Sequence, residues 1–263
     1  MDKLTLKLSL RVNSTIIRDN TSMRYAIIAD IHSNLPALQA VLFDIEKYGV
    51  DEIVCAGDVV GYGPFPNECI EIVEKTVAHT VMGNHDCAIL DTTELKYFNT
   101  YAREAIEWTL QVLIPKSVQF LSSLGMIKIL QDFTLVHSSP SSPGEWLYIF
   151  SLTEARKNFE HFRTPICFIG HSHIPTIFCH RNERCWVVRN TDIAIEPDTR
   201  YIINVGSVGQ PRDADPRASY GIYNTETQNF TLHRVPYDIQ TTQTKMAEMG
   251  LPTYLIKRLS YGR

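Results

Sequence analysis

The sequence predicts an α/β fold, a four-layer α-β-β-α sandwich of two mixed sheets with a helical cap segment. Three observations lead to this prediction. Apolar runs typical of strands alternate with helical patterns over residues 24–82, and a βαβαβ order predicts parallel strands with helices on the sheet faces. Residues 126–235 hold enough further strand patterns for a second sheet. The mainly helical stretch between them, residues 87–124, is expected to cap the strand ends.

The first elements alternate in type. An apolar run at residues 25–29 predicts a strand, and Asn34 is a candidate N-cap for a helix with apolar residues at helical spacing from Leu35 to Ile45. Gly49 is expected to end this helix. A strand at 52–56, a loop at 57–66, a helix at 67–75 and a strand at 77–82 follow.

The rest of the chain is richer in strands. A helical stripe that includes Ala102, Ile106 and Leu113 runs through the cap segment, and Pro115 interrupts it. Strands are predicted at 126–130, 133–136, 166–169, 176–180, 185–188, 201–203, 218–224 and 229–235, and short helices from Tyr237 onward. Without an internal repeat or a low-complexity linker, residues 23–263 are interpreted as a single domain.

Residues 1–22 are interpreted as an N-terminal extension. Basic residues such as Lys3 and Lys7 interrupt the apolar ones, so this stretch lacks the apolar core of a signal peptide. Met23 directly precedes the first predicted strand and is taken as the functional start. The alternative is a short edge strand at residues 4–8, where apolar residues alternate.

Composition narrows the function classes. The chain has 263 residues, of which 44% are hydrophobic. Its net charge of −4 offers no positive surface for a polyanion, so nucleic acid is not expected to be a partner. No apolar run approaches the ~20 residues of a membrane span, so no membrane role is expected. The six cysteines form no CxxC pair, which favours free thiols and a cytoplasmic protein over disulfides. The oligomeric state is left open.

Five short polar blocks each follow a predicted strand. The blocks are Asp30-Ile31-His32, Gly57-Asp58, Gly83-Asn84-His85-Asp86, His137 and Gly170-His171-Ser172-His173. Strand ends in an α/β sheet open toward one edge, so the blocks are expected to converge there. Each block alone is compatible with an ordinary polar turn, but five in succession predict a binuclear metal site at the strand ends, because carboxylate, imidazole and carboxamide groups suit divalent metals.

The block at residues 83–86 also offers candidate catalytic residues. Asn84 supplies a neutral oxygen ligand, and His85 is expected to face the substrate as the catalytic imidazole. Asp86 is expected to hold the tautomer of the His85 ring through its second nitrogen. The alternative is a turn that caps the following helix.

These blocks resemble those of the calcineurin-like metallophosphoesterase superfamily over residues 23–235. The segments 57–64 and 204–212 resemble its small bacterial and archaeal phosphodiesterase-like branch. The resemblance implies that one divalent ion takes Asp30, His32, Asp58 and His173, and that a second takes Asp58, Asn84, His137 and His171. It implies Mn²⁺ first, with Ni²⁺, Fe²⁺, Co²⁺ and Zn²⁺ as alternatives, and a metal-bridging hydroxide that attacks a small phosphoester substrate.

The departures from the family pattern refine this expectation. Phosphoprotein phosphatases and symmetrical dinucleoside tetraphosphatases of the superfamily carry an arginine shortly after Gly-Asp, whereas residues 59–62 here contain none. Arg212 is the candidate replacement that would bind phosphate. The alternative is a surface arginine paired with Asp213 or Asp215.

Hydrolysis of a phosphodiester is the favoured function. A phosphomonoesterase or nucleotidase using the same site is an alternative, and so is a non-catalytic metal-binding scaffold of this fold. The complete set of ligands together with His85 favours an enzyme. The aromatic residues between the blocks are expected to be packing residues, namely Tyr97, Phe98, Tyr101, Trp146 and Tyr148.

Overall fold

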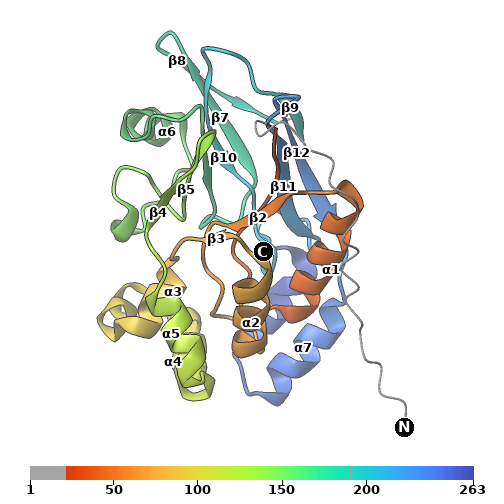
Figure 1. The fold of residues 1–263 in the computed structure, drawn as a ribbon. Coiled ribbons are helices and arrows are strands. Elements are labelled where there is room, and N and C mark those ends of the chain that lie inside the picture. The colour runs from red at the N-terminus through yellow and green to blue at the C-terminus, as the bar shows by residue number, and fades with distance from the viewer. Residues whose placement is uncertain (1–21, 190) are drawn as a thin grey trace.

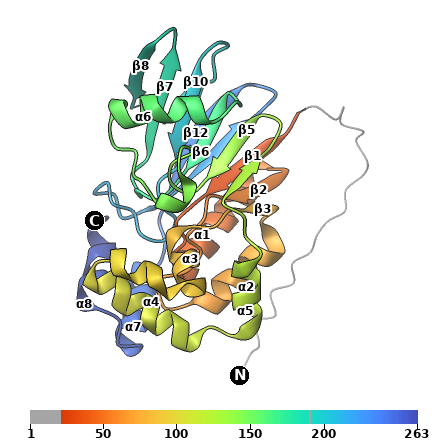
Figure 2. The ribbon, with the colours of Figure 1, turned by 90° about the vertical axis from the view of Figure 1, so that its left-hand side faces the viewer.

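Two six-stranded mixed sheets pack face to face between helices, as predicted (Figures 1 and 2). The structure is a computed structural model that describes residues 22–189 and 191–263. The proposed extension lies outside this range except for its last residue, so its interpretation stays a prediction, as does the alternative edge strand.

The first sheet contains the predicted parallel strands in the order β3-β2-β1-β11-β12-β9. Strands β1 (Arg24–Ile28), β2 (Glu52–Cys55) and β3 (His79–Thr80) are parallel, with α1 (Leu35–Ile45) and α2 (Pro66–Thr76) in the connections. Strands β11 (Ala218–Asn224), β12 (Asn229–Val235) and β9 (Asp192–Ala194) extend the sheet in antiparallel fashion. Asn34 caps α1 as predicted, since its side chain accepts a hydrogen bond from the Ala37 amide at 3.3 Å.

The second sheet has the order β4-β5-β6-β10-β7-β8. Its parallel centre consists of β5 (Phe133–Val136), β6 (Ile166–Ile169) and β10 (Arg200–Asn204). The antiparallel edges are β4 (Ile127–Ile129) on one side and the hairpin of β7 (Thr176–Arg181) and β8 (Arg184–Val188) on the other. Both sheets are therefore mixed.

Apolar side chains fill the space between the two sheets. Tyr25 and Ile27 of β1 pack there with Phe133, Phe168 and Tyr223, all of them buried. Aromatic side chains bury large apolar areas, which stabilises the contact between the sheets. A second apolar layer joins α1 and α2 to the outer face of the first sheet, and a third joins the second sheet to α6 (Leu152–Asn158), which lies on the opposite side in Figure 1.

The helical cap segment contains α3 (Asn84–Leu90), α4 (Thr100–Val112) and α5 (Pro115–Ser122), with a 3-10 helix at Thr92–Tyr97. Pro115 begins α5, where its missing N–H costs no hydrogen bond. The predicted short C-terminal helices are α7 (Ile239–Glu248) and α8 (Thr253–Arg258). Further 3-10 turns lie at Glu46–Tyr48, Pro143–Glu145, Phe159–His161 and Leu259–Tyr261. Figure 2 shows α3, α4 and α5 gathered beside one end of the sheets.

Helix α6 and strand β9 were not predicted, and strands β3 and β4 are shorter than expected. Helix α6 begins with a capping box, in which the Ser151 amide donates to the Glu154 carboxylate at 2.8 Å and the Glu154 amide donates to Ser151 Oγ at 3.3 Å. This Ser-x-x-Glu signal was present in the sequence. Strand β9 has three residues and exists through its pairing with β12, which no local pattern reveals. Strand β3 keeps two residues of the predicted 77–82, because only these pair with β2.

All six cysteines are free thiols. Across residues 22–189 and 191–263, no helix is both long and apolar enough to cross a bilayer.

Candidate metal centre

The predicted ligands converge at the ends of strands from both sheets. Asp30 and His32 follow β1, Asp58 follows β2, Asn84 begins α3, His137 follows β5, and His171 and His173 follow β6. Two buried groups result, Asp30 with His32, Asp58 and His173, and Asp58 with His137 and His171. Within each group the ligand atoms lie within 4.8 Å of one another. Asp58 belongs to both groups and therefore lies between two potential metal positions.

Short distances define the first group. His32 Nε2 lies 3.0 Å from His173 Nε2 and 3.5 Å from Asp58 Oδ2. His173 Nε2 lies 3.3 Å from Asp30 Oδ1. Four side chains therefore direct one atom each into a single small space.

The second group has the same character. His137 Nε2 lies 3.3 Å from Asp58 Oδ2 and 3.2 Å from His171 Nδ1. The same nitrogen lies 3.2 Å from Asn84 Oδ1, so the amide of Asn84 joins this group. The two groups contain the six predicted Asp and His ligands. Asn84, the seventh predicted ligand, adjoins the second group through its contact with His137.

The outer nitrogen of each imidazole meets a backbone carbonyl. His32 Nδ1 lies 3.0 Å from Val60 O, His173 Nδ1 2.6 Å from Gln210 O, His137 Nδ1 2.7 Å from Ala56 O, and His171 Nε2 2.8 Å from Trp146 O. Because a carbonyl oxygen only accepts, each outer nitrogen carries a proton, and the neutral rings of His32, His171 and His173 turn a lone pair inward. Two lone pairs 3.0 Å apart repel each other, so this donor set fits cations placed between its members.

The electrostatics of the buried site support the same conclusion. Burial holds the pKa of His32 and of His173 well below the usual value, and it lowers the pKa of His171 to about 3. These rings are therefore neutral at pH 7, which is the form that binds metals. Burial raises the pKa of Asp30 to about 8, and a bound cation would instead favour its charged form.

Asp58 and His137 form a coupled pair within this site. Burial alone would raise the pKa of Asp58, but the imidazoles of His137, His85 and His32 together outweigh burial and hold that pKa below its usual value, with His137 contributing most. Burial likewise opposes the charged form of His137, yet the Asp58 carboxylate raises the His137 pKa to about 9. In the absence of a metal, the proton on His137 therefore takes the place of a cation beside Asp58.

Five of the ligands have a left-handed backbone. The φ angles are 53° at Asp30, 49° at His32, 55° at Asp58, 68° at His171 and 60° at His173. Residues other than glycine adopt this conformation at a cost of about 1–2 kcal/mol each. Strain of this kind collects at functional sites, where the surrounding structure maintains it.

Two glycines of the sequence blocks make room for ligands from other blocks. A Cβ at Gly83 would overlap the carboxylate of Asp58, and a Cβ at Gly170 would lie 2.5 Å from Asp30 Oδ2. Each glycine therefore permits a ligand from a distant part of the sequence to approach its backbone. The amide that follows Gly170, that of His171, donates to Asp30 Oδ2 at 2.9 Å.

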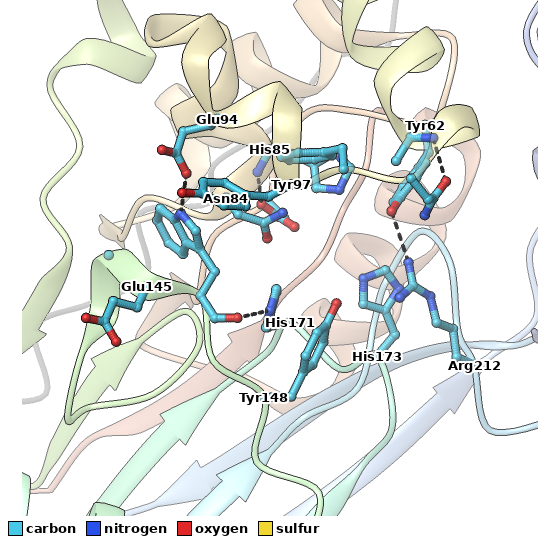
Figure 3. A pocket seen from close by; sticks show the side chains of 16 residues that line it. Tyr62, Asn84, His85, Glu94, Tyr97, Glu145, Tyr148, His171, His173 and Arg212 are labelled. Atoms are coloured by element: carbon cyan, nitrogen blue, oxygen red, sulfur yellow. Dashed lines mark hydrogen bonds between the residues drawn. The ribbon is translucent and has the colours of Figure 1, made fainter.

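His85 lies beside the ligand groups and belongs to neither. Its ring is 3% exposed and packs between Tyr62 and Phe98, with centroid distances of 4.4 and 4.8 Å. Figure 3 shows the ring pointing into the cavity. Its Nδ1 has no hydrogen-bond partner in the described part of the chain. Burial lowers the pKa of His85 to about 4, so the ring is neutral at pH 7.

The predicted contact between Asp86 and the His85 ring is wrong. The Asp86 carboxylate instead accepts hydrogen bonds from the backbone amides of Asp58 at 2.9 Å, Val59 at 3.0 Å, Val60 at 3.2 Å and Gly83 at 3.1 Å. The reason is geometric, because a side chain in the first turn of α3 is directed back over the helix N-terminus. Asp86 therefore positions the loop that carries Asp58, much as the helix-capping alternative implied.

Arg212 lines the cavity and is not a surface arginine paired with its neighbours. Its guanidinium donates to Gln210 Oε1 at 2.9 Å and to Tyr62 Oη at 3.3 Å. The two aspartates that follow it in sequence have other partners, because Asp213 pairs with Arg234 and Asp215 with Arg217. No described carboxylate forms an ion pair with this guanidinium, which lies at the edge of the metal centre.

A cavity of about 490 Å³ opens over the ligand groups (Figure 3). Four of the aromatic residues expected to be packing residues line it, namely Tyr97, Phe98, Trp146 and Tyr148. Tyr101 does pack, against Tyr254 at a centroid distance of 4.8 Å. The cavity is also lined by Tyr62, Glu94 and Glu145, which the sequence did not mark as functional. Only the flanking glycines of Tyr62 gave a signal, because they indicated a close-packed loop.

Comparison with known proteins agrees with this geometry. Residues 23–228 match the model of the calcineurin-like phosphoesterase superfamily domain. An uncharacterized protein of Methanocaldococcus jannaschii is 40% identical over 243 residues, which cover 90% of this chain and 98% of that protein.

Solved structures show the same architecture. A metallophosphoesterase from Sphaerobacter thermophilus is 43% identical, with a TM-score of 0.80 over 92% of this chain and 100% of its own. A hypothetical protein from Pyrococcus horikoshii OT3 is 20% identical, with a TM-score of 0.73 over 91% and 98% of the two chains, and shares the fold.

Proposed function

The chain belongs to the calcineurin-like phosphoesterase superfamily and is a phosphoester hydrolase, and we propose that it hydrolyses small phosphodiesters. The cavity is the observation that carries this proposal, because about 490 Å³ leaves room for organic groups beyond a phosphate. Its described lining contains a single arginine, Arg212, together with the two glutamates Glu94 and Glu145. A monoester carries about two negative charges near neutral pH and a diester one. A diester, with its single negative charge, therefore fits a cavity lined by one arginine and two glutamates better than a monoester does.

We propose that two divalent ions occupy the centre, with Asp58 shared between them. One would be held by Asp30, His32, Asp58 and His173, and the other by Asp58, Asn84, His137 and His171. Mn²⁺ is the favoured metal, with Ni²⁺, Fe²⁺, Co²⁺ and Zn²⁺ as alternatives. When bound, such ions activate a water as the nucleophile and neutralise charge on the phosphoryl oxygens.

Arg212 is proposed to bind a non-bridging phosphoryl oxygen. Gln210 and Tyr62 hold its guanidinium from two sides, so little conformational freedom is lost when the substrate binds. Its position at the rim of the first ligand group would place the phosphorus over the metal centre and direct the ester groups into the cavity.

His85 is proposed to donate a hydrogen bond or proton to the leaving oxygen. Its Nδ1 is buried against Gly61 without a partner. A buried N–H without an acceptor is less favourable than a bare lone pair, so the proton belongs on Nε2. That nitrogen is the one that remains available to the cavity. Such acid catalysis is typically worth ~10²–10⁴-fold in rate.

Polymeric nucleic acid is a poor fit for this site. The chain carries a net charge of −4, and Glu94 and Glu145 at the cavity would repel a polyanion. We therefore propose that a small molecule is the substrate and that hydrolysis requires neither a membrane nor a nucleic-acid partner.

A hydrolysis panel tests the proposal. Metal-stripped protein is supplied with Mn²⁺, Ni²⁺, Fe²⁺, Co²⁺ or Zn²⁺ and assayed on bis-p-nitrophenyl phosphate and p-nitrophenyl phosphate, with Asp58→Asn as the control for a damaged centre. We expect a higher kcat/KM on the diester. A higher value on the monoester would establish the phosphomonoesterase or nucleotidase alternative. Metal binding without hydrolysis of either ester would identify a scaffold.

A further inference from the structure

We propose that one ester group of the substrate carries a positively charged amine, which binds at the end of the cavity opposite Arg212. This inference rests on the proposed diesterase function. Glu94, Glu145, Tyr97 and Trp146 form that end, which we call the acidic-aromatic end. Figure 3 shows Glu94 and Glu145 on one side of His85 and His171, with Arg212 and His173 on the other. The cavity therefore separates a positive site for the phosphate from a negative site for another group.

Among the described residues, the two glutamates lack a positive partner. Neither Glu94 nor Glu145 makes an ion pair with any lysine or arginine in the described ranges. Lys96 follows closely in sequence, but its ammonium lies over the Tyr97 ring at 4.7 Å. Glu94 Oε2 accepts a hydrogen bond from Trp146 Nε1 at 3.3 Å, and this neutral donor positions the carboxylate without supplying a positive charge. A phosphate would be repelled here, whereas an ammonium would be attracted.

The aromatic side chains supply a second reason to expect a cation. Electron-rich ring faces attract ammonium groups, and Trp and Tyr do so more strongly than Phe. The contact of Lys96 with Tyr97 shows that one ring of this end already attracts an ammonium from its own chain.

Trp146 is held in place at the expense of backbone strain. Its φ is 55°, in the left-handed region, and its carbonyl accepts the hydrogen bond from His171 Nε2 at 2.8 Å. Strained residues of this kind persist where the surroundings require them, and they mark functional positions. The His85 ring, which is almost fully buried, lines the same cavity between its two ends. The acidic-aromatic end is thus a built part of the site.

Two other ester groups fit this end less well. A nucleobase would stack on the rings but would leave both carboxylates without a compensating charge. A polyphosphate chain would place negative charge against Glu94 and Glu145. A substrate with a cationic amine satisfies the rings and the carboxylates together, and its two opposite charges would orient it along the cavity.

A matched pair of chromogenic esters tests the inference. The p-nitrophenyl ester of phosphorylcholine carries a quaternary ammonium, and p-nitrophenyl 3,3-dimethylbutyl phosphate has the same shape without the charge. Both release p-nitrophenolate, so the ratio of their kcat/KM values measures recognition of the charge alone. For the unmodified protein with its preferred metal, we expect kcat/KM to be roughly tenfold or more higher on the cationic ester. Cation–π contacts together with the carboxylates predict a difference of this size.

The variant E94Q/E145Q should lower this ratio several-fold, because both carboxylates are lost and only the weaker attraction of the Tyr97 and Trp146 rings remains. The matched control Glu104→Gln removes the same charge from an exposed position on α4 outside the cavity, and it should keep the ratio of the unmodified protein. If the double variant fails to fold, Glu145→Gln carries the test, because Glu145 is exposed. It should lower the ratio by a smaller factor.

Different results would overturn different conclusions. Equal hydrolysis of the two esters by the unmodified protein, or a preference that is undiminished in E94Q/E145Q, overturns the cationic substrate and leaves the diesterase standing. A higher kcat/KM on p-nitrophenyl thymidine 5′-phosphate than on the phosphorylcholine ester assigns the aromatic end to a nucleobase and also overturns it. Hydrolysis of no diester with any metal overturns the proposed function, and this inference with it.

Discussion

Replacing Asp86 by asparagine should destabilise the loop that carries Asp58, although Asp86 contacts neither metal position. Oδ1 of this buried carboxylate accepts from the amides of Val59 and Val60, and Oδ2 accepts from those of Asp58 and Gly83. An asparagine side chain has one oxygen, so it can serve only one of these pairs in either orientation. Its amino group would face the N–H groups of the other pair.

The expected loss follows from this arrangement. Burial raises the pKa of Asp86 to about 7, so the full loss is expected above this pH, where the carboxylate is charged. Hydrogen bonds to a charged group are worth about 1.5–3 kcal/mol each, so losing two costs about 3–6 kcal/mol. A chain of this size changes its Tm by about 2–4 °C per kcal/mol, which gives a decrease of roughly 6–24 °C. The stabilisation by added Mn²⁺ should also shrink, because the backbone of the shared ligand Asp58 is less well held.

Thermal unfolding of the metal-stripped protein, with and without Mn²⁺, measures both effects. The matched control is Asp91→Asn at an exposed position, where Oδ1 accepts from the Thr93 amide at 2.9 Å. Asparagine caps a helix as well as aspartate does, so this variant should keep its Tm. If Asp86→Asn melts within a degree or two of the control, the four amide contacts do not stabilise the loop and the reasoning fails.

Three further predictions concern the centre and the chain start. His85→Ala should retain its metals by elemental analysis. Its kcat should fall roughly 10²-fold or more on an alkyl diester with a poor leaving group, and less on bis-p-nitrophenyl phosphate. Loss of metal, as expected for Asp58→Asn, would instead identify His85 as a ligand. Gly170→Ala should lower metal content and Tm because its Cβ would press on Asp30 Oδ2, whereas Gly144→Ala, with open space around it, should change neither. A chain that starts at Met23 should match the full chain in Tm and activity, and a fall of many degrees would show that residues 1–22 pack onto the fold.

The elements and the ligands were predictable because both follow local rules. Apolar periodicity identified the parallel strands, and the polar residues at their ends had to meet at one edge of the fold. Asp30 and His173 lie far apart in sequence, yet their ligand atoms lie 3.3 Å apart for this reason. The shared position of Asp58 follows from the same rule.

Contacts made through loops were not predictable from local pattern. The partners of Asp86 are amides from two loops, and the left-handed backbone of Asp58 in one of these loops is not revealed by the sequence. Arg212 is adjacent in sequence to Asp213, but Asp213 pairs with Arg234, which is brought close by the sheet. Trp146 looked like a packing residue, because composition does not indicate which side of a loop faces a cavity.

The backbone and the side chain of Trp146 have different roles in the site. The carbonyl of Trp146 holds the metal-ligand ring, while its indole forms part of the cavity wall. Every amino acid supplies the same carbonyl, so the side chain at this position can diversify without releasing His171. The left-handed φ of 55° favours glycine or asparagine among the replacements. Position 146 is therefore a place where natural variation or a mutant library can change which substrates are accepted while the metal chemistry is inherited intact.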